Sequence, residues 1–569
     1  MASSSESLDA SRILELMSGG LESISNWLWG LPLLYLLIGG GLYFTIYSRF
    51  VPFLYLSHSI QILRGKFNNP NDPGEINHFQ ALCSALSGTV GMGNITGVAV
   101  AIIQGGPGAL FWMWICALLG MATKFFTCSL AVMYRGTDQA GQVQGGPMYF
   151  ITEGLGTKWK PLAIAFCFFG LFGCLPMFQS NQLTAIVSEM FFKPNDWFID
   201  SSENVTLTGQ GLFGTLLAIL VGTVILGGIQ RIGKVAAALV PFMVILYGSC
   251  ALLIIIMHAA QIPEAFRLIF TDAFTGQAVT GGIIGTVIST GVRRAAFSNE
   301  AGMGTEAMAH GAAKTKEPIR EGLVAMLGPM IDTLIVCTIT GLVIINTGVW
   351  EKGVTIDRLY KLKNAIEEYA SDKNISPVIT NDLIETIITN KEFNNQKFYI
   401  ESLNHMDAWG RLIKLKNEIN SSNDKLIVIS SGPDKILNTA DDLTSEVSRN
   451  SYSGVMLTEK AYRMISSSLG PYLLLICVLC FSFSSMIGFS YYVTKCGIFL
   501  FGVKARTPLI LFYLSGIVVS AIVDLQYLIY FLDIMFGLMA VPTIISTIIL
   551  SPRVMKRAKE YFLSIKRVQ

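Results

Sequence analysis

Long runs of apolar residues recur along this chain, separated by mostly short polar connections. About 20 consecutive apolar residues suffice for a helix to cross the hydrocarbon layer of a membrane. Segments of this kind lie at roughly 31–48, 79–104, 108–134, 161–190, 211–228, 235–257, 280–310, 319–345, 467–500, 507–523 and 526–550. The pattern predicts an all-α polytopic membrane protein with about 11 transmembrane helices.

The second apolar run contains a stretch that fits a continuous helix poorly. Residues 88–97 include four glycines in ten positions, and glycine costs about 1 kcal/mol per residue in a helix interior. We therefore expect the helix to unwind near residues 89–93. Backbone exposed at membrane depth is tolerated where it lines a cavity, and many secondary transporters bind solute and ion at such a break.

A partner break is expected in the seventh apolar run, 280–310. Glycines are spread along this run at 281, 282, 285, 291, 302 and 304. The unwound point is therefore ambiguous between residues 289–291 and 297–304.

Composition supports the membrane assignment and removes other classes. Hydrophobic residues make up 52% of the chain, charged residues 14%, and the mean hydropathy is +0.53. The net charge of +2 gives no reason to expect a nucleic-acid partner. No HExxH or GxSxG motif falls in an apolar run, so the chain is not expected to be an enzyme.

The distribution of Lys and Arg predicts the orientation. Connections at 49–78, 135–160, 231–234, 293–320, 495–506 and 551–569 hold 22 of these residues. The other side, apart from one long loop, has only Arg12, Lys193 and Arg267. By the positive-inside rule the C-terminus is cytoplasmic and the N-terminus is outside.

The expected domain organisation follows from the runs. It comprises an outer N-terminal segment (1–30), helices 1–8 (31–345), an extracytoplasmic insertion (346–466), helices 9–11 (467–550) and a basic cytoplasmic tail (551–569).

Several motifs resemble those of the alanine or glycine:cation symporter family. They are Gly91-x-Gly93-Asn94-Ile95-x-Gly97, Gly105-Gly106-Pro107-Gly108, Phe297-Ser298-Asn299-Glu300-Ala301-Gly302 and Phe481-Ser482-Phe483-Ser484-Ser485. The resemblance implies sodium-driven uptake of a small neutral amino acid across the bacterial cytoplasmic (inner) membrane. It also implies a LeuT-type fold, with one extra N-terminal helix before two inverted five-helix repeats. The glycines around 91–97 favour alanine, glycine or serine as substrate.

The first break is the expected substrate site. Amides at the start of the second half-helix lack intrahelical partners and carry partial positive charge, which suits a carboxylate. Met92 and Gly93 are the expected carboxylate-binding backbone. The full set of substrate-facing candidates is Thr89, Met92, Gly93, Gln179, Asn181, Ser289, Phe297 and Asn299. For Gln179 and Asn181, a hydrogen bond between helices is an equally good interpretation.

The resemblance also implies a sodium site. It would use backbone oxygens near Ser87 and Val90 together with the hydroxyls of Ser484 and Ser485. A shell made only of oxygen suits a hard cation. A second sodium near Thr89 and Asn94 is an open alternative.

Ionisable residues at membrane depth are candidates for gating or coupling. Asp332 either couples ion to substrate or forms a structural pair with a neighbouring Thr or Arg. Arg293, Arg294 and Glu300 are expected to form an ion network at the inner gate. Thr127 stands where family members commonly carry Glu, which leaves the ion stoichiometry open.

The insertion at 346–466 is polar and departs from the family pattern. Its motifs Asp407-Ala408-Trp409-Gly410, Ser431-Gly432-Pro433-Asp434 and Asp441-Asp442 resemble the soluble part of a type II secretion major pseudopilin. The resemblance implies a small α+β domain with Ca²⁺ bound by Asp434, Asp441 and Asp442. The alternative is that these carboxylates only solvate a turn.

The role of the insertion is open. A lid, a module that docks an unknown extracytoplasmic protein, and a tolerated insertion all fit the sequence. A transporter-fold sensor that couples amino-acid binding to this domain is the alternative function.

Overall fold

The computed structural model describes residues 19–138, 141–200, 205–275, 284–372, 407–408, 413–420, 423–434, 439, 441–445, 447, 452, 454–523 and 525–566. Within these ranges, nine helices are long and apolar enough to cross a membrane, and one bent pair makes a tenth. The remaining predicted span, 280–310, appears as two shorter helices separated by a break. The all-α polytopic class is therefore confirmed.

Six spans are single helices of at least 17 residues, and they are α8 (Gly108–Met133), α12 (Leu207–Ile225), α13 (Gly228–Met257), α24 (Leu469–Phe501), α25 (Arg506–Ile522) and α26 (Leu525–Lys566). Three spans are composite: α2 (Leu31–Leu34), η1 (Tyr35–Gly39) and α3 (Gly40–Tyr47); α10 (Lys160–Gly173) and α11 (Met177–Val187); α17 (Pro318–Ala325), α18 (Leu327–Pro329), η8 (Met330–Cys337) and α19 (Thr338–Asn346). Connecting helices include α4 (Val51–Leu54), α5 (Leu56–Leu63) and α14 (Ile262–Thr275).

The first break interrupts the second span. Helix α6 (His78–Thr89) starts with a capping box, in which the Asn77 side chain accepts from the Gln80 amide and the Gln80 side chain accepts from the Asn77 amide. The chain leaves helical geometry at Val90 and resumes in η2 (Gly93–Gly97) and α7 (Val98–Gly105), bent by 52°. The glycine-rich stretch breaks the helix as its sequence predicts.

The second break lies between α15 (Ile284–Asn299) and α16 (Thr305–His310). Glu300 adopts φ +55°, and Gly302 and Gly304 adopt φ +94° and +83°. L-residues rarely take this left-handed conformation, and glycine takes it freely. The structure therefore selects the 297–304 alternative, because residues 289–291 lie inside the continuous helix α15.

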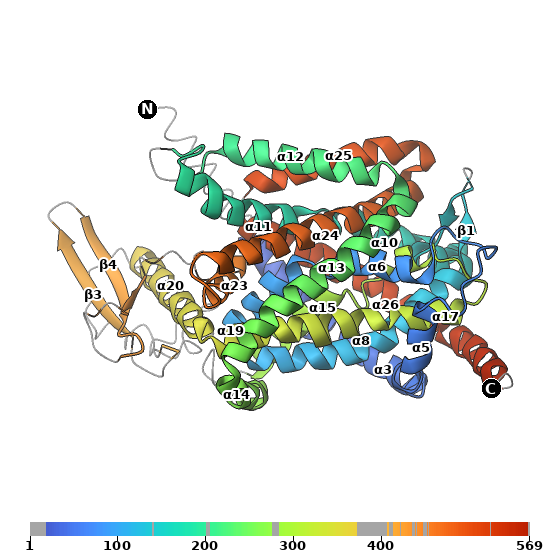
Figure 1. Cartoon of the computed structure of the whole chain (residues 1–569), viewed down its shortest axis with the longest axis horizontal. Helices are drawn as coiled ribbons and strands as arrows, with labels where there is room; N and C mark the ends of the chain where they lie inside the picture. The colour runs from blue at the N-terminus through green and yellow to red at the C-terminus, as the bar shows by residue number, and fades with distance from the viewer. Residues whose placement is uncertain are drawn as a thin grey trace.

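The two broken helices occupy matching places in the chain. After the first span, each broken helix begins a group of five spans, and five spans separate their starting points. They consequently run in opposite directions through the bundle. Helix α6 packs on α13, whereas α7 and α15 pack on α8 (Figure 1). This is the order that two inverted five-helix repeats require.

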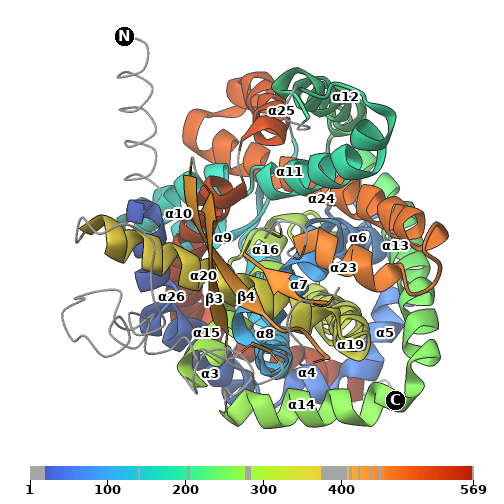
Figure 2. The same ribbon diagram turned by 90° about the vertical axis from the view of Figure 1, so that its left-hand side faces the viewer.

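The described part of the insertion forms a small α+β unit at one end of the bundle, here called the sheet end (Figure 2). Helix α20 (Val349–Asp372) packs on an antiparallel sheet of β3 (Lys414–Asn420), β4 (Asn423–Ser430) and β5 (Leu443–Thr444), with Lys414 opposite Ile429 and Ser430 opposite Leu443. Trp409 and Gly410 of the pseudopilin-like motif lie outside the described residues. Helix α23 (Gly454–Tyr462) leads back to α24.

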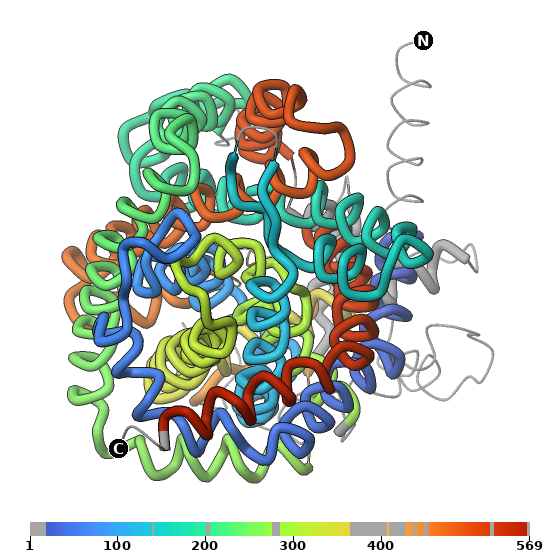
Figure 3. The backbone as a smooth tube through the Cα atoms, turned by 90° about the vertical axis from the view of Figure 1, so that its right-hand side faces the viewer, coloured from blue at the N-terminus to red at the C-terminus, as the bar shows by residue number. Residues whose placement is uncertain are grey.

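The opposite end of the bundle carries the C-terminus and the hairpin of β1 (Gly136–Thr137) and β2 (Val143–Gln144). We call it the C-terminal end. Here α26 continues as one helix through the predicted basic tail and lies across the surface (Figure 3). Phe562 stacks on Tyr55 with ring centroids 3.8 Å apart, and Arg557 forms an ion pair with Glu317 at 2.8 Å.

Candidate functional site

Asn94, the second residue of η2 in the second half of the first broken helix, links both breaks to the eighth span. Its side-chain oxygen accepts from the Gly91 amide at 2.8 Å. Its amide nitrogen donates to Asp332 Oδ1 at 2.6 Å and to Ser298 Oγ at 3.1 Å. Asn94 is fully buried, so these contacts hold the backbone of the first break against α15 and η8.

Asp332 receives hydrogen bonds from three elements. Besides Asn94, the hydroxyls of Ser298 and Thr333 donate to Oδ2 at 2.6 and 2.7 Å. Asn299 in turn donates to Thr333 Oγ1 at 3.1 Å and accepts from the Ala301 amide at 2.9 Å. These hydrogen bonds satisfy the buried carboxyl oxygens, which would otherwise be costly to bury. The structural pair with a threonine is present, and the coupling role of Asp332, which lies between the two breaks, stays a prediction.

The expected carboxylate-binding backbone faces the second break. An atom added at the Cβ position of Gly93 would lie 3.6 Å from the Phe297 carbonyl oxygen, so the two broken helices approach each other here. Met92 is fully buried beside Gly93. The Thr89 hydroxyl donates weakly to the Ala85 carbonyl at 3.4 Å in the preceding helix turn.

The serine hydroxyls expected to hold sodium lie against the first break. A Cβ added to Gly91 would meet Ser485 Oγ at 2.1 Å, so glycine is required for this approach. The hydroxyls of Ser484 and Ser485 are buried and have no hydrogen-bond partner among the described residues. Ser87 donates to the Ser84 carbonyl at 2.7 Å and faces Gly488 of the same helix as the serines. Such uncompensated oxygens fit a bound cation.

The other substrate candidates divide into two groups. Asn299 lies at the second break, and Gln179 has a buried side-chain oxygen without a partner in the described part of the chain. Asn181 instead donates to the carbonyls of Ser520 and Val523 at 3.2 and 2.8 Å, where α25 ends. The geometry thus favours the interhelical alternative for Asn181.

The side chains of Ser289 and Phe297 do not face an unwound backbone. Ser289 donates to the Thr286 carbonyl within the continuous helix α15, so it does not lie at a break. The Phe297 ring packs between Trp29 and Phe536, with centroids 5.4 and 5.1 Å away. Only the backbone of Phe297 faces the first break.

The second break carries two buried acidic side chains, Glu300 and Glu306, of which only Glu300 is among the predicted site residues. Glu300 Oε2 accepts from the Thr305 hydroxyl, and Glu300 Oε1 is buried without a partner in the described structure. Thr305 also lies 3.4 Å from Glu306, which accepts from Thr127 at 3.1 Å. Thr127, the departure from the family pattern, is therefore bonded to a buried carboxylate. Only the proximity of Glu306 to the Glu300 motif could have pointed to it.

The expected inner-gate network of Arg293, Arg294 and Glu300 is wrong. Arg293 pairs with Asp533 on α26 and donates to Ser25 Oγ at 2.5 Å. Arg294 is buried with its guanidinium 5.9 Å from the Phe297 ring, whereas Glu300 bonds Thr305 beyond the helix end. The two arginines belong to a membrane helix and not to a loop, so they do not count toward the charge of the connections.

The insertion touches the second half of the first broken helix. A Cβ on Gly353 of α20 would lie 3.2 Å from Ile103 of α7. A Cβ on Gly454, which begins α23, would lie 3.1 Å from Thr96 of η2. The segment between the eighth and ninth spans therefore covers α7 at the sheet end.

The predicted calcium loop is held by its own hydrogen bonds. Asp441 accepts from the Thr439 hydroxyl at 2.7 Å and from the Asp434 amide at 3.0 Å. The Thr439 hydrogen bond, followed by that of the amide, lowers the pKa of Asp441. Asp442 lies 3.3 Å from Thr439. In the described ranges no group of three His, Cys, Asp or Glu side chains is placed to hold a metal, so calcium gains no support.

Opposed broken helices, tied together by buried polar side chains inside a polytopic bundle, define a secondary transporter. The chain belongs to the sodium:alanine symporter family, whose profile matches residues 14–400 and 421–569. Membership identifies the chain as a transporter and not an enzyme. It implies an amino acid as substrate and Na⁺ as the ion carried with it.

Individual relatives agree with this family. An uncharacterized transporter of Haemophilus influenzae is 33% identical over 554 residues, 96% of each chain. The sodium/alanine symporter AgcS of Methanococcus maripaludis is 42% identical over 333 residues, 58% of this chain and 70% of AgcS. Among solved structures, MhsT in complex with L-phenylalanine matches with 13% identity and a TM-score of 0.36, covering 81% of this chain and 99% of MhsT.

Proposed function

We propose that this protein is a sodium-coupled symporter that imports small neutral amino acids, with alanine, glycine and serine as substrates, by alternating access. The observation that carries the proposal is the junction of the two breaks at Asn94, Ser298 and Asp332. Each of these side chains is fully buried, so the junction lies where a sequestered solute would bind.

The two breaks suit the two ends of an amino acid. The start of η2 presents helix amides around Met92 and Gly93, which favour a carboxylate. The end of α15 presents carbonyls before Glu300, which favour the substrate ammonium. A zwitterion placed between Gly93 and Phe297 would be attracted at both ends. The close approach of these residues supports a small side chain.

The proposed sodium site lies on the opposite face of the first break from the proposed substrate site. Ser484 and Ser485 offer buried hydroxyls, that of Ser485 beside Gly91, and the backbone oxygens near Ser87 and Val90 would complete a neutral shell. A bound Na⁺ there would stabilise the bend at Val90 and thereby the amides that hold the substrate. This physical link is the basis of the proposed coupling. The second sodium near Thr89 and Asn94 has less support, since the amide oxygen of Asn94 already accepts from Gly91.

Asp332 is proposed as the coupling residue. It contacts α15, η2 and η8 at once, so relative motion of the broken helices must rearrange its hydrogen bonds. We place the protein in the bacterial cytoplasmic membrane with its C-terminal end inside, because that end carries the basic connections. The insertion then lies outside and covers the outward path as a lid.

Binding of labelled L-alanine to the purified protein tests this proposal. We expect binding in Na⁺ but not in K⁺, with competition by glycine and serine and none by phenylalanine. Asn181→Ala serves as a matched control, because its amide bonds α25 and not the junction, and it should bind normally. Equal binding in K⁺ would contradict sodium coupling, and competition by phenylalanine would contradict the small pocket.

A further inference from the structure

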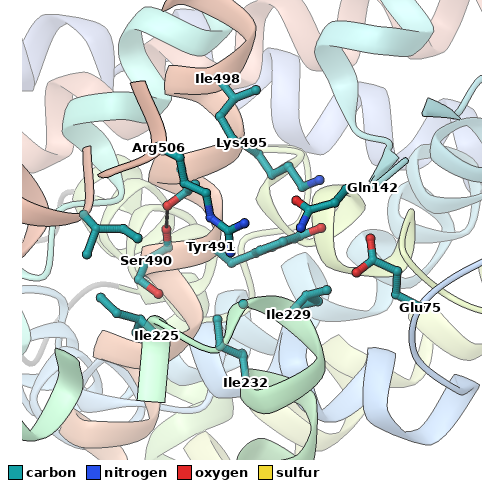
Figure 4. Close-up of a pocket in the computed structure, with 13 residues that line it drawn as sticks. Glu75, Gln142, Ile225, Ile229, Ile232, Ser490, Tyr491, Lys495, Ile498 and Arg506 are labelled. Atoms are coloured by element: carbon teal, nitrogen blue, oxygen red, sulfur yellow. Dashed lines mark hydrogen bonds between the residues drawn. The ribbon is translucent and has the colours of Figure 1, made fainter. Parts of the chain in front are cut away.

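A cavity at the C-terminal end lies apart from the substrate site. It is bordered by the end of α12, the starts of α13 and α25, the end of α24 and the loops that carry Glu75 and Gln142 (Figure 4). Its apolar wall consists of Ile225, Ile229, Ile232, Ile498 and Ile510. Polar and charged side chains, among them Glu75, Tyr491, Lys495 and Arg506, line the rest of the cavity together with Gly228.

Positive charge in this cavity is only partly compensated. Lys495 donates to the Val143 carbonyl at 2.6 Å and to Gln144 Oε1 at 3.0 Å, and Glu75 and Asp138 attract its charge. For Arg506, in contrast, no hydrogen bond or ion pair of the guanidinium is found within the described ranges. Arg506 is thus the unmatched charge of the cavity.

Two helix N-termini add to this positive potential. Arg506 is the first residue of α25, and Gly228, the first residue of α13, lines the same cavity. A Cβ on Gly228 would lie 3.0 Å from Arg506 Nη2, so the guanidinium rests on the first turn of α13. A cation next to helix N-termini is unfavourable unless an anion joins them.

Tyr491 provides an independent indication of a ligand. Its side chain is only 8% exposed, and its hydroxyl has no hydrogen-bond partner among the described residues. Because a buried hydroxyl costs free energy when it lacks a partner, a ligand oxygen in the cavity would stabilise it.

We propose that this cavity binds a phosphate-bearing anion, held by Arg506, the Tyr491 hydroxyl and the first turns of α13 and α25. The isoleucine wall fits the glycerol and upper acyl region of a phospholipid. Basic pockets between transmembrane helices on the cytoplasmic side are suited to anionic headgroups. A free phosphate in solution shares the same chemistry. An occupant would link the ends of helices from both repeats to the loop that precedes α6.

The experiment measures the melting temperature of the full chain in detergent, with added dioleoylphosphatidylglycerol or with inorganic phosphate. Arg506→Gln removes the unmatched charge, and Tyr491→Phe removes the hydroxyl. Arg231→Gln is the matched control, since Arg231 lies on the first turns of α13, does not line the cavity and donates to the Thr223 carbonyl. Arg506→Lys restores the charge.

We expect phosphatidylglycerol to raise the melting temperature of the unaltered protein and of Arg231→Gln. In Arg506→Gln the lipid concentration that gives half of this shift should rise about tenfold, with a smaller rise in Tyr491→Phe and partial recovery in Arg506→Lys. If inorganic phosphate alone reproduces the shift with the same dependence on Arg506, the source is a soluble phosphate. Equal responses of Arg506→Gln and Arg231→Gln to both probes would overturn the proposal.

Discussion

The two helix breaks differ in backbone conformation and in the polar side chains that surround them. Both contain glycines, but the first lies beside Asn94 and neutral serine hydroxyls. The second places Glu300 in a left-handed conformation and has buried carboxylates at Glu300 and Glu306. One break therefore presents backbone to a ligand, and the other presents buried carboxyl groups.

The two breaks therefore suit different parts of the ligands. The neutral break can bind a cation and a carboxylate together, because it adds no charge of its own. The acidic break favours positive charge, such as a substrate ammonium. Lys124 is buried in the same region, and its charge attracts Glu300 and Asp332. Variants of the acidic break should thus affect the substrate with little effect on the ion.

The largest effect is expected for Asn94→Leu, which removes the side chain that links the breaks. Uptake should fall at least a hundredfold, because three hydrogen bonds, each worth about 1 kcal/mol, are lost around a buried carboxyl group. Insertion into the membrane should persist. Asn346→Leu is the matched control, since its buried amide has no partner in the described part of the protein. Normal uptake by Asn94→Leu would show that the junction is not required for transport.

The double change Ser484→Ala and Ser485→Ala should act on the ion. The Na⁺ concentration for half-maximal uptake should rise roughly tenfold, because two oxygen ligands each contribute about 1 kcal/mol. Measurement of alanine uptake against Na⁺ concentration tests this. Ser490→Ala on the same helix is the control, since Ser490 Oγ donates to the Ile487 carbonyl within α24. An unchanged Na⁺ dependence in the double variant would remove the assigned sodium site.

Glu300→Gln should act on the substrate instead. The amide can still accept from Thr305, so the fold at the break should persist while the carboxyl group is lost. We expect the half-saturating alanine concentration to rise about fivefold, in line with loss of a charge-assisted contact, with the Na⁺ dependence nearly unchanged. A change confined to Na⁺ would reverse the roles given to the two breaks.

Asn181→Ala should have a small effect on transport. It removes the hydrogen bonds to the end of α25 and should destabilise the protein by about 1 kcal/mol. Uptake by the folded protein should stay within about twofold. Thermal unfolding together with initial uptake rates distinguishes these effects, and a loss of uptake without a loss of stability would restore Asn181 as a substrate contact.

The smallest effect concerns calcium in the insertion. If Asp434, Asp441 and Asp442 bind Ca²⁺ as the motif implies, replacement of all three by Asn should lower the melting temperature of the full chain in calcium and leave it unchanged in chelator. Transport should change little, because the loop lies outside the bundle. The same change in both conditions would exclude the site.

The sequence anticipated those features that depend on local chemistry. Gly91 and Gly93 predict the first break because glycine is unfavourable in the interior of any helix. The second break was ambiguous, since glycines are scattered through 281–304 and only packing decides which of them unwinds.

Features that depend on distant partners were not predictable. Arg293 resembles a loop charge until Asp533, far along the chain, is seen to neutralise it. Asn181 likewise bonds carbonyls at the end of α25. A neighbouring Thr was one expected partner of Asp332, but Ser298 was not, because nothing local distinguishes the hydroxyl residue that binds this carboxyl group.

The most direct test of the central claim is uptake of radiolabelled L-alanine into proteoliposomes that contain the purified full chain. An inward Na⁺ gradient is compared with the same gradient of K⁺. Accumulation above equilibrium with Na⁺ alone is the result that our account predicts. Accumulation in neither condition, or equally in both, by folded and inserted protein would contradict a sodium-coupled alanine symporter.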